Sequence, residues 1–207
     1  IRLEVTDAAY VVELDDSDHP LEIPSANNGN NPLKLVSGFT VAAGGLSDFT
    51  IDFDLRKAVV KPSCAQCDYK LRPALRLVNN LEVGSIAGEV DPSLAPEGVE
   101  ITDCAVYVYE GHDVAGDDYG SATEPLTSSA VVQATNQLGE PLAPEMFEYT
   151  VGYLAAVREG VEGSGLYTVA LTCIEDDPEN DDDLLPIESA NAIVQPKDET
   201  PLGFPQR

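Results

Sequence analysis

Four cysteines are the residues of this chain with the most distinctive chemistry. Cys64 and Cys67 have the Cys-x-x-Cys spacing of redox and metal motifs. A redox pair needs a thiolate stabilised by a helix N-terminus or by nearby cations. Residues 62–69 instead have the pattern of a hairpin tip between two strands, and no helical pattern follows them. We therefore expect a small disulfide that closes this loop, with metal or redox chemistry as the alternative.

The other two cysteines, Cys104 and Cys173, lie in the two strongest strand patterns of the second half of the chain. A bond between them would close a loop of about 70 residues, which the loop-entropy model credits with roughly 4 kcal/mol. We expect this structural disulfide, and an even set of cysteines in a strand-rich chain favours an oxidising compartment. A zinc site made of all four cysteines is disfavoured, because they would have to converge from two units.

Carboxylates are concentrated in two loops of the second half. Residues 113–118 contain three aspartates, and residues 175–183 contain seven acidic residues in nine positions. Calcium takes roughly six to eight oxygen ligands, which such loops can supply, although the fixed order of an EF-hand is absent. The candidate calcium ligands are Asp176, Asp177, Glu179, Asp181, Asp182 and Asp183. A solvated acidic loop is the alternative.

Catalysis finds little support in the sequence. His19 precedes Pro20 in a polar turn, and His112 lies in a glycine-rich loop. Motifs for a hydrolase nucleophile, a P-loop or dinucleotide binding are absent from the sequence. Asp52 and Asp54 share one face of a predicted strand, which we expect to be solvated rather than to hold a glycosidase pair. We therefore predict that the protein is not an enzyme.

Aromatic residues are the other feature that could bind a ligand, since sugar sites commonly use aromatic platforms. The chain has eight tyrosines and no tryptophan. Four of the tyrosines alternate within two predicted strands, at Tyr107, Tyr109, Tyr149 and Tyr153. We expect these four rings to pack in or beside the core rather than to line a sugar groove.

Charge divides the chain into two parts and excludes some partners. The 37 acidic and 11 basic residues give a net charge of −26, which repels nucleic acid and anionic membranes. Residues 1–87 hold 12 acidic and 8 basic residues, whereas residues 88–207 hold 25 and 3. This difference indicates two units, and a saline habitat is a rival to ion binding as the reason for the acidity. No apolar run of about 18 residues could form a membrane-spanning helix.

Short segments of alternating polarity, separated by turns, predict an all-β fold. The 15 prolines and 16 glycines fit many short elements better than long helices. Predicted strands include residues 2–6, 39–41, 49–55, 58–60, 71–78, 83–90, 104–109, 147–154 and 165–173. Their spacing is typical of two β-sandwich units in tandem, at residues 1–82 and 83–193. Residues 194–207, with three prolines, are predicted to form an extended tail.

Six ordered blocks in residues 1–78 carry a family resemblance. They read IRLEVT, PLEIPS, LKL, FTVAAGG, DFDLRKAVV and YKLRP. This stretch resembles the later half of the domain of unknown function (DUF) 4382, found in exported bacterial and archaeal proteins and often in lipoproteins. The resemblance implies that the first strands of this domain lie upstream. Because the chain starts directly in a strand pattern at Ile1, we also expect residues before it, either a signal peptide, an anchor or half a domain. From Gly84 onward, a shorter resemblance is to prealbumin-like or carboxypeptidase-regulatory-like sandwich modules, which are close in architecture to Ig-like domains.

These observations predict a non-enzymatic protein, exported to the cell surface or the extracellular space, with a structural or adhesive role. Its expected partners are other copies of itself, as in a filament, or components of the cell envelope. An open sheet edge at residues 1–6 would accept a strand from a neighbour. The alternative function is a surface module that binds calcium or a polysaccharide.

Overall fold

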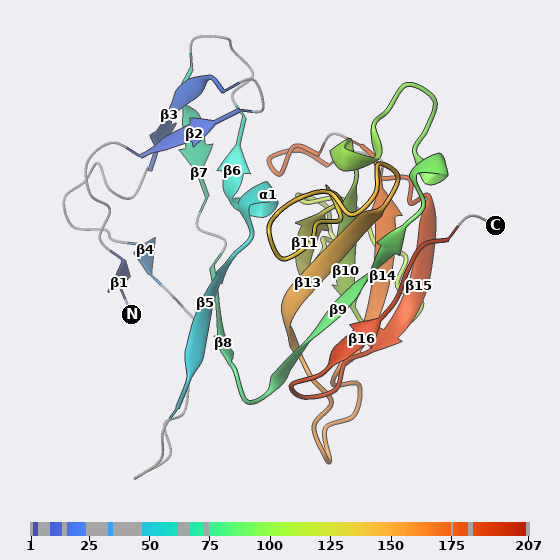
Figure 1. The fold of residues 1–207 in the computed structure, drawn as a ribbon. Coiled ribbons are helices and arrows are strands. Elements are labelled where there is room, and N and C mark those ends of the chain that lie inside the picture. Colours follow the sequence, from blue (N-terminus) through green and yellow to red (C-terminus); the bar gives the residue numbers. More distant parts are fainter. Residues whose placement is uncertain are drawn as a thin grey trace.

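The computed structural model describes residues 2–3, 9–13, 16–23, 33–34, 47–61, 67–72, 75–174, 176–181 and 184–205. The chain is mostly β, with 44% strand and 6% helix, and its several sheets are consistent with tandem β-sandwiches. The all-β prediction is therefore confirmed. Two parts lie side by side, and the larger one contains the C-terminal half of the chain (Figure 1). None of the helices in the described residues is long and apolar enough to span a bilayer.

The larger part is a sandwich of two four-stranded sheets. The first, here called the β10 sheet, has the order β11 (Thr127–Ala130), β10 (Ala105–Glu110), β14 (Leu166–Thr172) and β15 (Glu188–Ile193). The second, the β9 sheet, has the order β12 (Val132–Gln133), β13 (Phe147–Ala155), β9 (Val83–Val90) and β16 (Glu199–Pro201). Two short 3₁₀ helices, η1 (Pro92–Leu94) and η2 (Ile101–Asp103), connect β9 to β10. Neighbouring strands are antiparallel except β16, which runs parallel to β9.

The main core lies between the two sheets. Val106 and Val108 from β10 meet Ile86 from β9 and Val151 from β13, and all four are buried. The opposite face of the β10 sheet is covered as well. It carries a second buried cluster, made of Ala105, Tyr107, Tyr109, Tyr119, Ala170 and Leu184. Because both faces of β10 are covered, its first five residues are all buried, and its sequence is a nearly continuous apolar run.

The segment predicted as an extended tail is part of the sandwich instead. Within it, β16 pairs with β9, and Phe204 forms a bridge with Val90. Phe204 is 1% exposed and packs in the main core beside the ring of Tyr149. Pro201 is tolerated because β16 lies at the edge of its sheet. There, the missing N–H of proline does not deprive a neighbouring strand of a hydrogen bond. Composition alone therefore misassigned this segment.

A β-bulge interrupts β13 near its end. The register with β9 shifts between Val151 and Leu154, so Leu154 is buried while Tyr153 is 42% exposed. Tyr153 has a backbone φ of 58°, a conformation that costs a bulky L-residue roughly 1–2 kcal/mol. Among the described non-glycine residues with positive φ, it is the one that lies within a strand. Tyr153 therefore does not share the buried face of Tyr149, where regular alternation along the strand would place it.

The smaller part is built from shorter elements. One sheet has the order β2 (Tyr10–Val12), β3 (Asp18–Glu22), β7 (Tyr69–Leu71) and β6 (Val59–Val60). A two-stranded ribbon joins β5 (Phe49–Phe53) to β8 (Leu75–Asn79), and a second one joins β1 (Arg2–Leu3) to β4 (Leu33–Lys34). The buried apolar cluster of this part, within the described residues, consists of Ile23, Ala58 and Leu71.

Two details of this smaller part bear on the sequence predictions. The strand expected at 49–55 ends at Phe53, because Asp54 begins the short helix α1 (Leu55–Ala58) and caps it through the backbone N–H of Lys57. At the edge predicted to be open, Arg2 and Leu3 pair with Lys34 and Leu33, and residues 4–6 lie outside the described part of the chain. The strand predicted at 39–41 also lies outside it.

Candidate functional site

The contact between the two parts is centred on Asp54. Its carboxylate accepts hydrogen bonds from the Tyr119 hydroxyl at 2.6 Å, the Ser128 backbone N–H at 2.8 Å and the Thr127 hydroxyl at 3.3 Å. The same carboxylate caps α1, so it connects the helix to β11 and to the loop after β10. Asp54 is thus a partly buried junction residue, which contradicts the expectation of a solvated strand face.

Two basic residues of α1 extend this contact over buried tyrosines. The guanidinium of Arg56 lies 5.6 Å from the ring centre of Tyr107, and the Lys57 ammonium lies 5.3 Å from that of Tyr119. Lys57 also forms an ion pair with Glu124 at 2.8 Å. Burial raises the pKa of both tyrosines well above the ordinary value, so both remain neutral hydrogen-bond donors.

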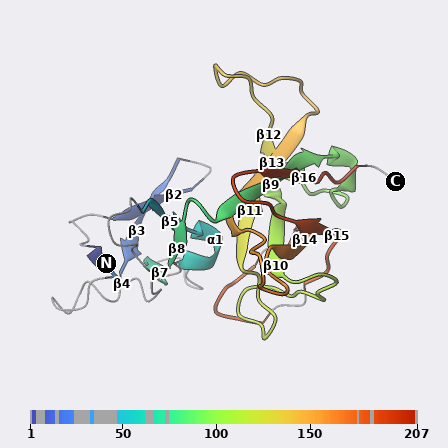
Figure 2. The same ribbon diagram turned by 90° about the horizontal axis from the view of Figure 1, so that it is seen from below.

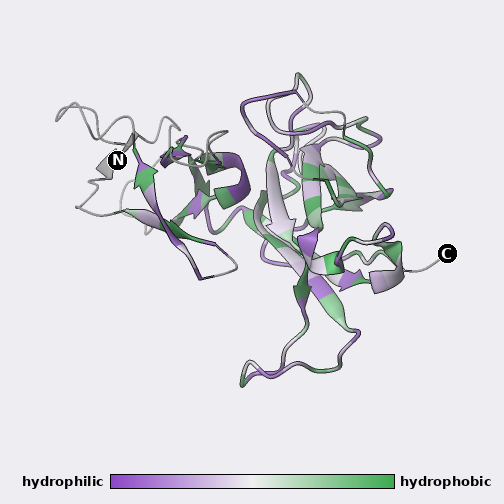
Figure 3. Cartoon of the chain, turned by 90° about the horizontal axis from the view of Figure 1, so that it is seen from above, coloured by the Kyte–Doolittle hydropathy of each residue, from purple (hydrophilic) through white to green (hydrophobic). Residues whose placement is uncertain are grey.

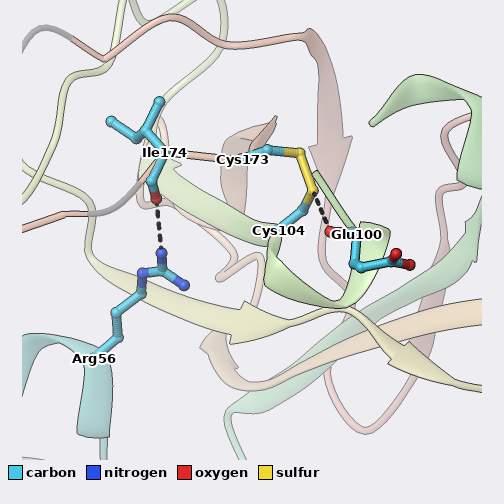
Figure 4. The surroundings of a disulfide bond; sticks show 5 residues. All are labelled: Arg56, Glu100, Cys104, Cys173 and Ile174. Atoms are coloured by element: carbon cyan, nitrogen blue, oxygen red, sulfur yellow. Dashed lines mark hydrogen bonds between the residues drawn. A yellow bond between two sulfur atoms is a disulfide. The ribbon is translucent and has the colours of Figure 1, made fainter. Parts of the chain in front are cut away.

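The disulfide and the start of the acidic loop at residues 175–183 lie next to the contact between the two parts. Cys104, directly before β10, and Cys173, directly after β14, are bonded as the sequence predicted, and they are separated by 69 positions. Arg56 donates a hydrogen bond to the carbonyl of Ile174, the residue after Cys173, at 3.0 Å (Figure 4). Arg72 donates to the carbonyl of Pro178 further along the same loop. The smaller part therefore holds both ends of the segment between residues 174 and 178.

Among the described residues, the predicted calcium ligands Asp176, Asp177, Glu179 and Asp181 do not gather at one point. Asp176 accepts hydrogen bonds from the Tyr107 hydroxyl and the Tyr119 backbone, and Asp177 accepts from the Glu179 backbone to close its own turn. Glu179 is exposed. Asp182 and Asp183 lie outside the described residues.

Asp181 lies close to two carboxylates of the other acidic loop. One carboxylate oxygen from each of Asp117, Asp118 and Asp181 lies within 4.8 Å of the others. Asp118 is fully buried, whereas Asp181 is exposed. Gly120 lets the loops approach this closely, since a Cβ there would lie 2.2 Å from the Asn180 carbonyl. The sequence showed two acidic clusters, and the structure combines members of both.

A groove runs along the boundary between β8 and the sandwich. The cleft lined by Asp54 and Lys57, here called the upper cleft, has a volume of about 560 Å³. The adjoining cleft lined by Asn79 and Tyr153, here called the lower cleft, has a volume of about 430 Å³. Arg76, Glu110 and Leu126 line both clefts. Tyr153 and Arg158 line the lower one.

The histidines do not have the geometry of a catalytic relay. The Ser17 hydroxyl lies 3.0 Å and a Glu13 carboxylate oxygen 3.6 Å from the same nitrogen, Nε2, of His19. A serine–histidine–carboxylate relay requires the two groups on opposite ring nitrogens. His112 Nε2 lies 3.1 Å from the Ala192 carbonyl, which is a structural contact at the edge of the β10 sheet.

Cys67 takes part in a disulfide, and Cys64 lies outside the described residues. The sequence-based expectation for a Cys64–Cys67 bond therefore stays a prediction.

Comparison with known proteins assigns only the smaller part. Residues 1–73 match the domain of unknown function DUF4382. The DUF4382 match ends just before β8, and the sandwich that follows has no family support. No curated protein and no solved structure matches the chain significantly.

Two residues of this region were not identified as functional from the sequence. Asp54 was assigned to a solvated face, although its position after an apolar strand and three residues before Lys57 fits a helix cap. Tyr153 was expected to pack in or beside the core, because strict alternation carries no sign of a bulge. A bulge depends on the partner strand, so only the tertiary structure shows it.

Proposed function

We propose that this protein is a non-enzymatic, exported structural or adhesive protein, displayed at the cell surface or incorporated into an extracellular assembly. The DUF4382 match supports export, because that family resemblance implies exported proteins and lipoproteins. The Cys104–Cys173 disulfide supports an oxidising location. The likeness of the sandwich to prealbumin-like surface modules is part of the same proposal.

The observation that carries the proposal is a hairpin loop that stands out from the sandwich. Residues 134–146 connect β12 to β13 and extend away from both sheets (Figure 2). Hydrophobic residues occur along this loop (Figure 3). Leu138 is 83% exposed, and Leu142 and Met146 are exposed as well. Apolar side chains gathered on a projecting loop are typical of a contact surface.

The tip of this hairpin is held in one shape. The Asn136 side-chain oxygen accepts hydrogen bonds from the backbone N–H groups of Leu138 and Glu140, at 2.8 and 3.0 Å. The backbone N–H of Gly139 donates to the Asn136 carbonyl, and Gly139 has a φ of 78° that suits glycine. A turn that is already ordered loses little entropy on binding, which favours a role in association. The proposed partners are other copies of this chain or components of the cell envelope.

The test is to compare the assembly of the wild-type chain with that of Leu138→Glu, by light scattering and electron microscopy. Leu185→Glu is the matched control, since Leu185 is 76% exposed and lies outside the hairpin. We expect oligomers or envelope-bound particles for the wild type and for the control, and their loss in Leu138→Glu. A wild-type chain that stays monomeric at high concentration and does not bind envelope preparations would contradict the proposal.

Calcium binding is a second candidate function, favoured by the convergence of Asp117, Asp118 and Asp181. Calorimetry with CaCl₂ should then give a binding heat and a rise in Tm, because an ion that binds only the folded state stabilises it. Asp181→Asn should remove both effects, whereas Glu179→Gln, an exposed change in the same loop, should not. Absence of heat and of a Tm shift in the wild type rejects this candidate.

A further inference from the structure

The bulge in β13 directs an aromatic ring away from the core. Alternation along β13 buries Tyr149 and Val151 and would bury Tyr153 next, but the register shift turns Tyr153 outward and buries Leu154 in its place. Tyr153 adopts its positive φ at this point. Bulges commonly redirect a side chain beside a functional site, and backbone strain in a bulky residue persists only where the surroundings impose it.

The redirected ring lies in a groove. Tyr153 lines the lower cleft, whose volume is about 430 Å³, together with Arg76 and Asn79 from β8. Arg158, Glu82 and Glu110 complete its polar lining. One exposed aromatic ring therefore faces a cleft whose other polar groups are planar amide, guanidinium and carboxylate groups. Phe49 and several aliphatic residues also line the cleft, and an apolar lining with a few such polar groups is typical of a ligand site.

The charges in this cleft are balanced. Arg76 forms an ion pair with Asp52, with its Nε at 2.9 Å from the carboxylate, and Arg158 lies 3.9 Å from a carboxylate oxygen of Glu82. Burial, and to a lesser extent Glu110, raises the pKa of Tyr167 to about 12, while Arg76 and Arg158 lower it. Tyr167 lies just beneath, since its hydroxyl donates to the Ala155 carbonyl at 2.8 Å. The cleft lining thus contains two arginines and two glutamates, and their formal charges cancel.

We propose that the lower cleft binds a neutral sugar unit of a polysaccharide, with the Tyr153 ring stacked against the apolar face of the sugar. The paired arginines and carboxylates, with Asn79, offer both donors and acceptors to sugar hydroxyls without selecting a charge. Asn79 is held in place by the hydrogen bond from the Leu81 backbone N–H to its side-chain oxygen, at 3.1 Å. This inference rests on the proposed adhesive function and names the chemistry of one ligand.

The test is affinity electrophoresis of the full chain through gels that contain dextran, laminarin or mannan, with polygalacturonate as an anionic probe. We expect at least one neutral polysaccharide to retard the wild type, and Tyr153→Ala to weaken that binding about tenfold. Tyr10→Ala is the matched control, since Tyr10 is 62% exposed and lies on β2, far from the cleft in the sequence. Retardation by the anionic probe alone, by none of the probes, or equally in Tyr153→Ala would overturn the proposal.

A second variant separates binding from folding. Tyr153→Gly should raise Tm, because glycine adopts a positive φ without strain, and should also lose polysaccharide binding. A lower Tm in Tyr153→Gly would show that the ring is retained for packing and would overturn the proposal. Leu138→Glu should keep polysaccharide binding while it loses assembly. A loss of polysaccharide binding can therefore be assigned to the lower cleft, and a loss of assembly to the hairpin loop at residues 134–146.

Discussion

The two parts of this molecule differ in how they are held together. The sandwich encloses a main core of seventeen buried residues, and a second cluster covers the far face of its β10 sheet. In the described residues of the smaller part, the corresponding cluster has three members. The sandwich also carries most of the net charge, with 25 acidic and 3 basic residues after position 87. The larger core tolerates the larger charge, because burial of apolar surface outweighs the repulsion between solvated carboxylates.

This difference indicates that the smaller part depends on the larger one. Its basic residues Arg56, Lys57 and Arg72 reach into the acidic sandwich, and Asp54 joins the two parts through donors of β11 and Tyr119. We expect docking of α1 to contribute to the stability of the smaller part, because its described residues form a cluster of three. The predictions below test this dependence.

The largest expected effect is alkaline unfolding of the sandwich. Burial raises the pKa of Tyr107, Tyr109, Tyr119, Tyr149 and Tyr167 above the ordinary 10.0. The folded state therefore keeps these phenols neutral at pH values where the unfolded chain ionises them. Their stabilisation is fully present below pH 10 and is lost as the pH rises from there toward the folded-state values, by about 1.4 kcal/mol per pH unit for each tyrosine. Tm and tyrosinate absorbance should be followed from neutral pH to about pH 11.

Tm should fall steeply above pH 10, and most tyrosinate should form only as the sandwich unfolds. Smooth ionisation of all tyrosines near pH 10 with the fold intact would show that these hydroxyls are accessible to water.

Removal of the Cys104–Cys173 disulfide should have the next largest effect. The bond closes a loop across 69 positions, and the double change to alanine should lower the free energy of unfolding of the sandwich by about 4 kcal/mol. Hydrogen exchange, followed peptide by peptide, should show faster exchange in β10 and β14. Exchange in β3 and β7 should change less, and equal acceleration in both parts would mean that they unfold as one unit.

The Asp54→Ala change should reverse this pattern. It removes the acceptor for Tyr119, Thr127 and Ser128 together with the cap of α1, and it should cost about 3 kcal/mol, because buried donors lose their partner. Exchange should accelerate in α1 and β6 while β14 stays protected. Asp48→Ala is the control, since Asp48 is exposed at the start of the same ribbon. An unchanged α1 in the Asp54 variant would argue that the smaller part folds without docking.

The Lys57–Glu124 ion pair should contribute least. The two side chains are 28% and 47% exposed, so solvent screens their attraction, and a double-mutant cycle with Lys57→Ala and Glu124→Gln should give a coupling of about 0.5 kcal/mol. Urea denaturation curves of the four proteins provide the measurement. A coupling of several kcal/mol would place this pair, rather than Asp54, at the centre of the contact.

Much of the sandwich could be predicted because its strands obey local rules. The segment 104–109 has an uninterrupted apolar pattern, and β10 is buried on both faces. The domain boundary placed near residue 82 stays a prediction, and it lies in the segment between β8 and β9. The calcium site stays a prediction, and two of its residues, Asp176 and Asp177, accept hydrogen bonds from the chain itself. Acidic composition indicates where carboxylates are abundant, but not which of them face a common point.

The sequence by itself determined the strand-rich class, the cysteine pair of the sandwich and the DUF4382 portion, because these follow from local pattern and residue type. Only the tertiary structure decided that residues 199–201 complete a sheet, that Asp54 joins the two parts and that Tyr153 faces a groove. Each of these depends on a partner more than 25 positions away, whether a strand, a hydroxyl or a facing surface. Local periodicity carries no information about such a partner. A segment with the same alternation of polar and apolar residues can pair at the edge of a sheet or dock on another part, and a bulge can turn one of its side chains outward.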